Sequence, residues 1–183
     1  MMRALFLQAP ACDGFDGGAG SRYQARREIR SFWYPTWLAQ AAALLPNSKL
    51  IDAVPHRTEL GAIVREAKQY DLAVLHTSTP SFRSDLIALE ALKATNPALI
   101  AGFVGAKVAA DPAGSLASSP SIDFVAGNEF ELTIREIAEG RELAGIAGLS
   151  YRDRDGAIKH NPPRPVLEDM DQLPSSHRST SAT

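Results

Sequence analysis

Short apolar segments alternate with longer amphipathic ones along most of the chain. The apolar segments predict β-strands at Arg3–Ala9, Lys49–Val54, Asp71–Thr77, Leu99–Gly105 and Ile122–Gly127. The segments between them predict helices at Tyr34–Leu45, Thr58–Tyr70, Ser81–Thr95, Val108–Ala117 and Glu129–Glu139. Strands that alternate with helices pair in parallel through right-handed crossovers, which predicts a doubly wound α/β sandwich. We expect the strand order 2-1-3-4-5, with helices on both faces of the sheet.

The pattern changes after Gly140. Ala147–Arg152 and Ala157–His160 flank an Asp-Gly turn and predict a β-hairpin. Three prolines within Asn161–Pro165 predict an extended linker, and the small polar residues from Ser175 onward predict a disordered tail. The expected organisation is therefore a main domain over 1–143, a hairpin with linker over 144–174, and a tail over 175–183.

Composition narrows the function classes. The 183 residues carry a formal net charge of −2, which provides no global basic field for nucleic acid. A single cysteine excludes an intrachain disulfide and any all-cysteine zinc or iron–sulfur site within this chain. Apolar runs are too short for a transmembrane segment or a signal peptide. We expect a cytoplasmic protein, with contact to a membrane surface left open.

Ligands of open α/β sheets bind at the carboxyl ends of the strands, so the loops there carry the candidate chemistry. The loop Pro10–Arg30 after the first strand is unusually long and combines glycines with Arg22, Arg26, Arg27 and Arg30. Its glycines let a backbone approach a large ligand, and its arginines can meet phosphate or carboxylate groups. A solvated, flexible loop is the alternative.

The loops after the later strands add polar groups. Thr77, Ser78 and Thr79 place three hydroxyls ahead of a helix, where they can contact a ligand or only cap the helix at Ser81 or Ser84. Gly102 and Gly105 admit either a bulky ligand or a tight turn. Glu129 and Glu131 after Gly127 also suit the dipole of a helix start.

Several motifs that would identify a specific ligand or activity are absent. Lys107 lacks the neighbours of a Walker phosphate loop, and Gly18–Tyr23 lacks the third glycine of a dinucleotide fingerprint. A receiver domain would need an aspartate where His76-Thr77 stands. Cys12 and His76 end neighbouring predicted strands, so a Cys–His nucleophile of a small hydrolase is an alternative. His56, His160 and His177 show no metal-binding spacing and are expected on the surface.

The order of these pieces resembles the N-terminal cobalamin-binding domain of B12-dependent radical SAM proteins, most closely the hopanoid-biosynthesis-associated type often called HpnJ. The segments that carry the resemblance are Met2–Pro10, Asp13–Ile29, Ser31–Ala39, His76–Phe82, Gly102–Lys107, Asp123–Glu129 and Glu168–Pro174.

The resemblance implies a flavodoxin-like domain that holds the corrin ring over the carboxyl ends of its strands. The residues that it assigns to cobalamin are Phe15, Gly17, Gly18, Thr77, Ser78, Thr79, Gly105, Ala106, Gly127, Asn128 and Glu129. The pattern Asp-x-His-x-x-Gly is absent after the first strand, so the resemblance implies a cobalt without a protein histidine ligand.

Full-length relatives continue into a barrel whose C-x-x-x-C-x-x-C motif holds a [4Fe–4S] cluster and S-adenosylmethionine. With Cys12 alone, this chain is expected to be a truncated product that is not catalytic by itself, with a radical SAM domain in trans as a candidate partner. For a full-length relative, the resemblance implies cyclitol ring contraction in hopanoid biosynthesis. A non-functional remnant is the further alternative.

Overall fold

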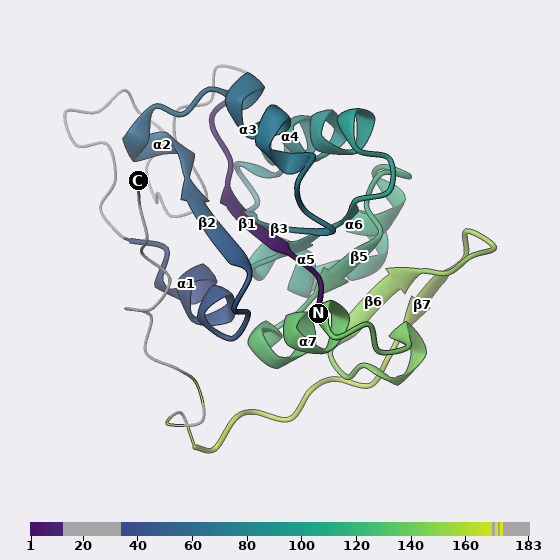
Figure 1. Cartoon of the computed structure of the whole chain (residues 1–183). Helices are drawn as coiled ribbons and strands as arrows, with labels where there is room; N and C mark the ends of the chain where they lie inside the picture. The colour runs from purple at the N-terminus through teal and green to yellow at the C-terminus, as the bar shows by residue number, and fades with distance from the viewer. Residues whose placement is uncertain (13–33, 170, 172, 174–183) are drawn as a thin grey trace.

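In the described part of the chain, a seven-stranded sheet carries helices on both faces (Figure 1). The computed structural model describes residues 1–12, 34–169, 171 and 173. In chain order the elements are β1 (Ala4–Gln8), α1 (Thr36–Ala43), β2 (Ser48–Asp52), α2 (Ala53–His56), α3 (Leu60–Ala67), β3 (Leu72–His76), α4 (Phe82–Thr95), β4 (Ile100–Val104), α5 (Ala106–Ala110), α6 (Pro112–Ala117), β5 (Phe124–Ala126), α7 (Phe130–Ala138), the 3₁₀ helix η1 (Leu143–Gly145), β6 (Leu149–Arg152) and β7 (Ile158–His160).

The strand order is β2-β1-β3-β4-β5-β6-β7, and the first five strands are parallel. This confirms the predicted order 2-1-3-4-5 and the α/β fold class. The predicted hairpin also forms, and its strand β6 pairs antiparallel with β5, so the hairpin extends the same sheet. An antiparallel edge on a parallel sheet is common in this class of fold.

Two hydrophobic cores lie on opposite faces of the sheet. Alternation along β1 sends Leu5 and Leu7 toward α3, α4, α5 and α6, and sends Phe6 toward α1 and α7. Figure 1 shows α3 and α4 on one side of the sheet and α1 and α7 on the other. Burial on both faces explains why Leu72–Leu75 is a continuous apolar run.

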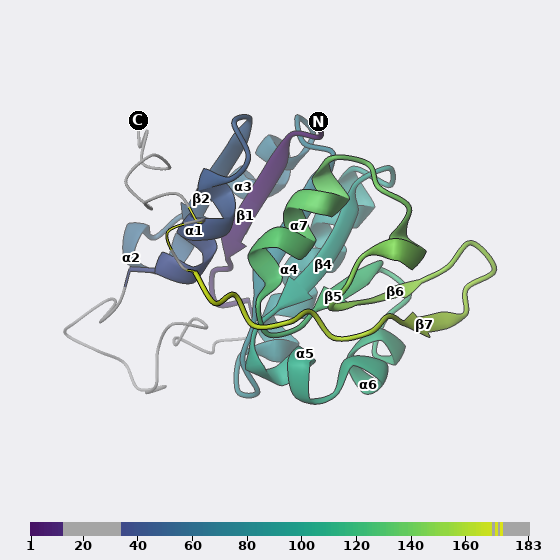
Figure 2. The same cartoon turned by 90° about the horizontal axis from the view of Figure 1, so that it is seen from below.

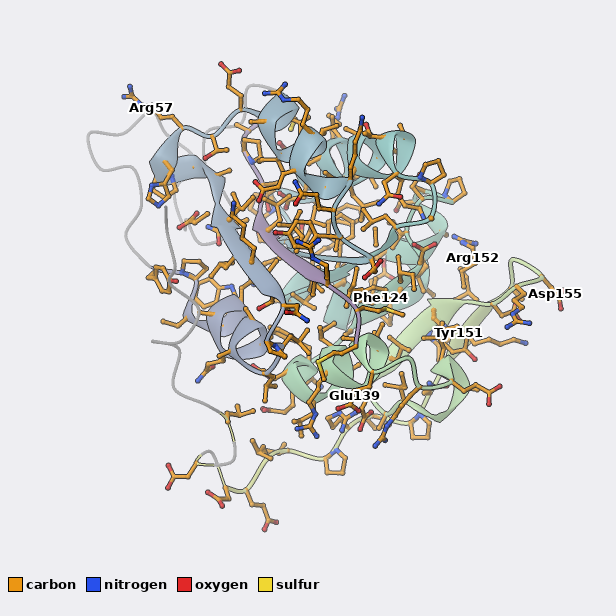
Figure 3. The ribbon with its side chains drawn as sticks, viewed as in Figure 1. Arg57, Phe124, Glu139, Tyr151, Arg152 and Asp155 are labelled. Atoms are coloured by element: carbon orange, nitrogen blue, oxygen red, sulfur yellow. The ribbon has the colours of Figure 1, made fainter. Side chains whose placement is uncertain are left out.

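The hairpin continues this division between the faces. Tyr151, the register partner of Phe124, packs in the core beside α7 (Figure 3). The guanidinium of Arg152 donates to the Leu116 carbonyl at the end of α6. The hairpin is thereby fixed to helices on both sides of the sheet.

Most elements end within a few residues of the predicted bounds, and two differences change the arrangement of elements. The strand expected to reach Val54 ends at Asp52, where the short helix α2 begins. The single helix expected over Val108–Ala117 is divided into α5 and α6 at Asp111, whose φ is −141°. The residue before a proline avoids helical dihedrals, and the Asp111 side chain accepts a hydrogen bond from Gly114 N to cap the second helix.

Candidate functional site

The carboxyl ends of the parallel strands gather most of the residues predicted to bind a ligand. His76–Thr79 follow β3, Gly105 follows β4, and Gly127–Glu129 follow β5. A hydrogen bond from Thr77 N to Val104 O joins the first two of these loops. Phe15, Gly17 and Gly18 lie outside the described residues.

The three hydroxyls after β3 have different surroundings. Thr77 is fully buried, and its hydroxyl donates to Asp85 Oδ2 of α4 over 2.7 Å. Ser78 is half-buried, and its Oγ lies 2.9 Å from Ser81 Oγ at the start of α4. Thr79 is exposed. Thr79 thus presents an exposed hydroxyl at this edge, and Ser78 presents a half-buried one that also pairs with Ser81.

Gly105 sits where β4 turns into α5, and its φ of +118° lies in the region that L side chains rarely adopt. A Cβ built on it would overlap the Thr77 carbonyl oxygen and lie 3.2 Å from His76 Nε2. Only glycine lets these two loops approach so closely. Ala106, the next residue, is exposed at the first position of α5.

Gly102 has a structural role. It is the register partner of Phe124, and a Cβ there would overlap the Phe124 carbonyl oxygen. The close approach of β4 and β5 accounts for this glycine without a ligand.

The loop after β5 is shaped by Asn128, which has a φ of +48° and an exposed side chain. Glu129 and Glu131 line a cavity of about 230 Å³ between the start of α7 and the extended segment that contains Arg164. Burial, together with the nearby Glu129 charge, raises the pKa of Glu131.

Three side chains at the ends of β1, β2 and β3, and one on α1, carry buried polar atoms without a hydrogen-bond partner among the described residues. These atoms are Gln8 Oε1, Asp52 Oδ1, His76 Nδ1 and Trp37 Nε1. The Trp37 and His76 rings lie 5.1 Å apart at an interplanar angle of 40°. Sequence reasoning missed Gln8, Asp52 and Trp37. For Gln8 and Asp52 the available signal was a polar residue that closes an apolar strand, whereas Trp37 of α1 gave no such signal.

Burial shifts the pKa values of two of these groups in opposite directions. It raises the pKa of Asp52 to about 6, although His56 opposes the shift. It lowers the pKa of His76 to about 4, so this imidazole is neutral at neutral pH. The Asp52 carboxyl therefore titrates much closer to neutral pH than an ordinary aspartate.

The structure contradicts the alternative in which Cys12 and His76 form a Cys–His nucleophile. Cys12 packs against the core under α3 and α4, and its backbone N–H donates to Ser84 Oγ of α4. His76 lies on the other face of the sheet, stacked on Trp37 of α1. The sheet lies between the thiol and the imidazole, because Cys12 packs with the core on the α3 and α4 side and His76 contacts Trp37 on the α1 side.

The other histidines form no metal site in the described part of the chain. His56 and His160 are exposed, as expected, whereas His177 lies outside that part. Residues 1–12, 34–169, 171 and 173 contain no group of three or more metal-ligating side chains. In the same ranges, no helix has the length and apolar character needed to cross a bilayer.

No family model matches the sequence. An uncharacterized methyltransferase of Pyrococcus horikoshii is 30% identical over 158 residues, which cover 81% of this chain and 34% of that protein. The chain thus spans about a third of the length of this curated relative.

Solved structures share the fold. A radical S-adenosylmethionine methyltransferase, TsrM from Kitasatospora setae with cobalamin and a [4Fe–4S] cluster bound, superposes with a TM-score of 0.65 at 16% identity, covering 96% of this chain and 31% of that one. The cobalamin-dependent S-adenosylmethionine radical enzyme OxsB, with aqua-cobalamin and S-adenosylmethionine bound, gives 0.62 at 20% identity, covering 73% and 20%. The chain is similar to one part of each of these larger proteins.

Proposed function

We propose that this chain is a cobalamin-binding domain that holds the corrinoid at the carboxyl ends of its parallel strands. The observation that carries the proposal is the group of buried, unpaired polar atoms on Gln8, Asp52, His76 and Trp37. Buried polar atoms in native proteins nearly always have partners, so such a group points to a ligand that supplies them. The shared fold with two cobalamin-containing structures supports the identity of that ligand.

The residues at this edge fit a large, amide-rich cofactor. Gly105 brings backbone to the surface without a side chain, Ser78 and Thr79 offer hydroxyls, and Asn128 offers an amide. We propose that these residues, with Ala106, Gly127 and Glu129, contact the corrinoid. Phe15, Gly17 and Gly18 remain part of the proposed site on the resemblance alone.

Thr77 has a different proposed role. Its hydroxyl is already committed to Asp85, so it fixes the loop that carries Ser78 and Thr79 and does not reach the ligand by its side chain. Thr77 is a positioning residue in this proposal.

Cobalamin would supply a cobalt ion whose oxidation state and upper ligand can change. We propose that no protein imidazole coordinates this cobalt. The imidazole at the end of β3 is packed against Trp37 and the Gly105 turn, which supports this arrangement.

The role in a larger enzyme is a further proposal. The curated relative is named a methyltransferase, and both solved structures are radical S-adenosylmethionine enzymes. We propose that the domain acts with a radical SAM domain, which binds the iron–sulfur cluster and S-adenosylmethionine. The resemblance in sequence supports a hopanoid-modifying enzyme of the HpnJ type.

The test is retention of the cofactor. The purified chain is mixed with hydroxocobalamin and passed over a gel-filtration column, while absorbance is followed at protein and corrin wavelengths. Co-elution of corrin with the protein supports the proposal, and elution of corrin only in the small-molecule volume contradicts it. A spectrum with histidine-coordinated cobalt would reject only the axial-ligand part.

A further inference from the structure

Two hydrogen-bond acceptors lie side by side at the ends of β1 and β2 without a donor among the described residues. Gln8 and Asp52 are register partners in the parallel pair, 2% and 9% exposed. Gln8 Oε1 and Asp52 Oδ1 are both buried and unpaired. Leaving such an acceptor unsatisfied destabilises a fold markedly, so two in neighbouring positions require a shared explanation.

The end of β3 extends this line of polar residues, which we call the row, and adds groups that can donate hydrogen bonds. Leu7 pairs with Leu75, so His76 follows at the position beside Gln8. Trp37 of α1 stacks on His76, and its indole N–H can only donate. Alternation along the strands places Gln8, Asp52 and His76 on the face covered by α1. The carboxyl ends of β2, β1 and β3 therefore carry, on this one face, two unpaired acceptors and one imidazole nitrogen, with the indole N–H of Trp37 beside the imidazole.

The hydrogen-bonding groups in the row limit the kind of ligand group that can bind there. A phosphate has no donor for the two acceptors and would face the Asp52 carboxylate, so an anion is disfavoured. A cation would leave the Trp37 donor unsatisfied. A ligand group that both donates and accepts hydrogen bonds can serve the acceptors of Gln8 and Asp52 as well as the donor of Trp37.

We propose that Gln8, Asp52, His76 and Trp37 form a recognition site for an uncharged polar group of the ligand, a primary amide or a hydroxyl. This inference rests on the proposed function, because a cobalamin carries such amides on its corrin ring and a hydroxyl on the ribose of its nucleotide tail. The phosphate of the tail binds elsewhere.

The variant Asp52→Asn tests this site. Its new amide can donate to Gln8 Oε1, which satisfies the pair internally and removes the demand for a ligand donor. Titration of the full chain at pH 8 with hydroxocobalamin should show affinity weakened about tenfold or more. The free variant should unfold at the same temperature as the parent or higher. A residue with only a structural role would not combine weaker binding with retained stability.

Two more variants complete the design. Gln8→Met removes the other acceptor at similar volume, and it should also weaken binding without destabilising the free chain. Asp71→Asn is the matched control, because Asp71 is exposed at the opposite edge of the sheet, where its carboxylate accepts from Arg3 N. Its affinity for hydroxocobalamin should equal that of the parent.

A second ligand distinguishes the source of the recognised group. Cobinamide keeps the ring amides and lacks the nucleotide tail. If Asp52→Asn weakens cobinamide and cobalamin alike, the group is a ring amide; if it weakens cobalamin alone, the group is the ribose hydroxyl.

The outcomes separate the two proposals. Parent-like affinity of Asp52→Asn and Gln8→Met for hydroxocobalamin would show that the row holds only water and would overturn this inference, while leaving the proposed function intact. A parent chain that binds no cobalamin would overturn both.

Discussion

Thr77 of β3's outgoing loop donates a 2.7 Å hydrogen bond to Asp85 in the first turn of α4, and both residues are at most 2% exposed. The bond gives a buried carboxylate a donor and ties the carboxyl end of β3 to the helix that follows it. The Thr77 hydroxyl, for which the sequence predicts a ligand contact, instead stabilises the loop after β3 by bonding to α4.

Replacing Thr77 should affect stability more than binding. Thr77→Val keeps the shape and removes the hydroxyl that bonds to Asp85, so it should lower the free energy of unfolding by about 1–3 kcal/mol. Chemical denaturation measures this change. Thr79→Val is the matched control, because Thr79 is exposed and its replacement should leave stability nearly unchanged.

Replacing Ser78 and Thr79, whose hydroxyls are more accessible, should affect binding more than stability. The double variant Ser78→Ala with Thr79→Ala should weaken cobalamin binding by roughly tenfold, if each lost hydrogen bond contributes about 0.5–1.5 kcal/mol. Isothermal titration compares it with the parent and with Cys12→Ser, whose affinity should not change. Parent-like affinity of the double variant would place the cofactor contacts elsewhere on this edge.

Gly105→Ala should destabilise the chain strongly, by about 2 kcal/mol or more, because it combines a strained φ with overlap of the Thr77 carbonyl. Two glycines separate these causes. Gly140 has a φ of +78°, but a Cβ added to it would meet no atom within 4 Å, so Gly140→Ala should show strain alone, about 1 kcal/mol. Gly127 has an ordinary φ and a nearest contact of 3.6 Å, so Gly127→Ala should be tolerated. Thermal unfolding of the three variants should follow this order.

The pH dependence of stability should reveal Asp52 and His76 as opposing groups. Asp52 has its pKa raised from 3.8 to about 6, so folding takes up a proton in that window and stability falls as pH rises through it. His76 has its pKa lowered from 6.5 to about 4, so folding releases a proton and stability rises as pH rises from 4 to 6.5. The two effects oppose each other between about pH 4 and 6.

Single variants should expose each effect. Relative to the parent, Asp52→Asn should gain stability with rising pH across this range, and His76→Gln should lose it. Urea unfolding at several pH values between 4 and 7 measures both slopes. Equal slopes in the parent and Asp52→Asn would show that this carboxyl is not perturbed.

The extended segment after β7 is held against α7 and runs on toward α1 (Figure 2). Arg164 bonds to Glu136 at 2.5 Å and to Thr133 Oγ1 at 2.9 Å. Arg164→Ala should release this segment and speed its cleavage in limited proteolysis. Arg154→Ala, in the exposed hairpin turn, should leave the cleavage rate unchanged.

The sequence predicts the fold well because its signals are local and repeated. Apolar runs such as Leu72–Leu75 and the helices between them define a parallel sheet, and the order follows from crossover rules. Pro112 carried a signal for the break between α5 and α6 that helical periodicity masked.

The candidate site is predicted less completely because its key relationships are tertiary. The loop positions after β3, β4 and β5 follow from topology, but the partner of the Thr77 hydroxyl depends on how α4 packs. The juxtaposition of Gln8 with Asp52 depends on the register of β1 against β2, which no short motif encodes. The separation of Cys12 from His76 depends on which face of the sheet each occupies.

Cobalamin binding at the carboxyl edge is the central claim, and equilibrium titration of the full chain with hydroxocobalamin tests it most directly. A saturable change in the corrin absorbance with one corrinoid per chain, weakened in Asp52→Asn and in the Ser78/Thr79 double variant but not in Asp71→Asn, is the predicted result. A corrin spectrum that stays that of the free cofactor at every protein concentration would contradict the claim.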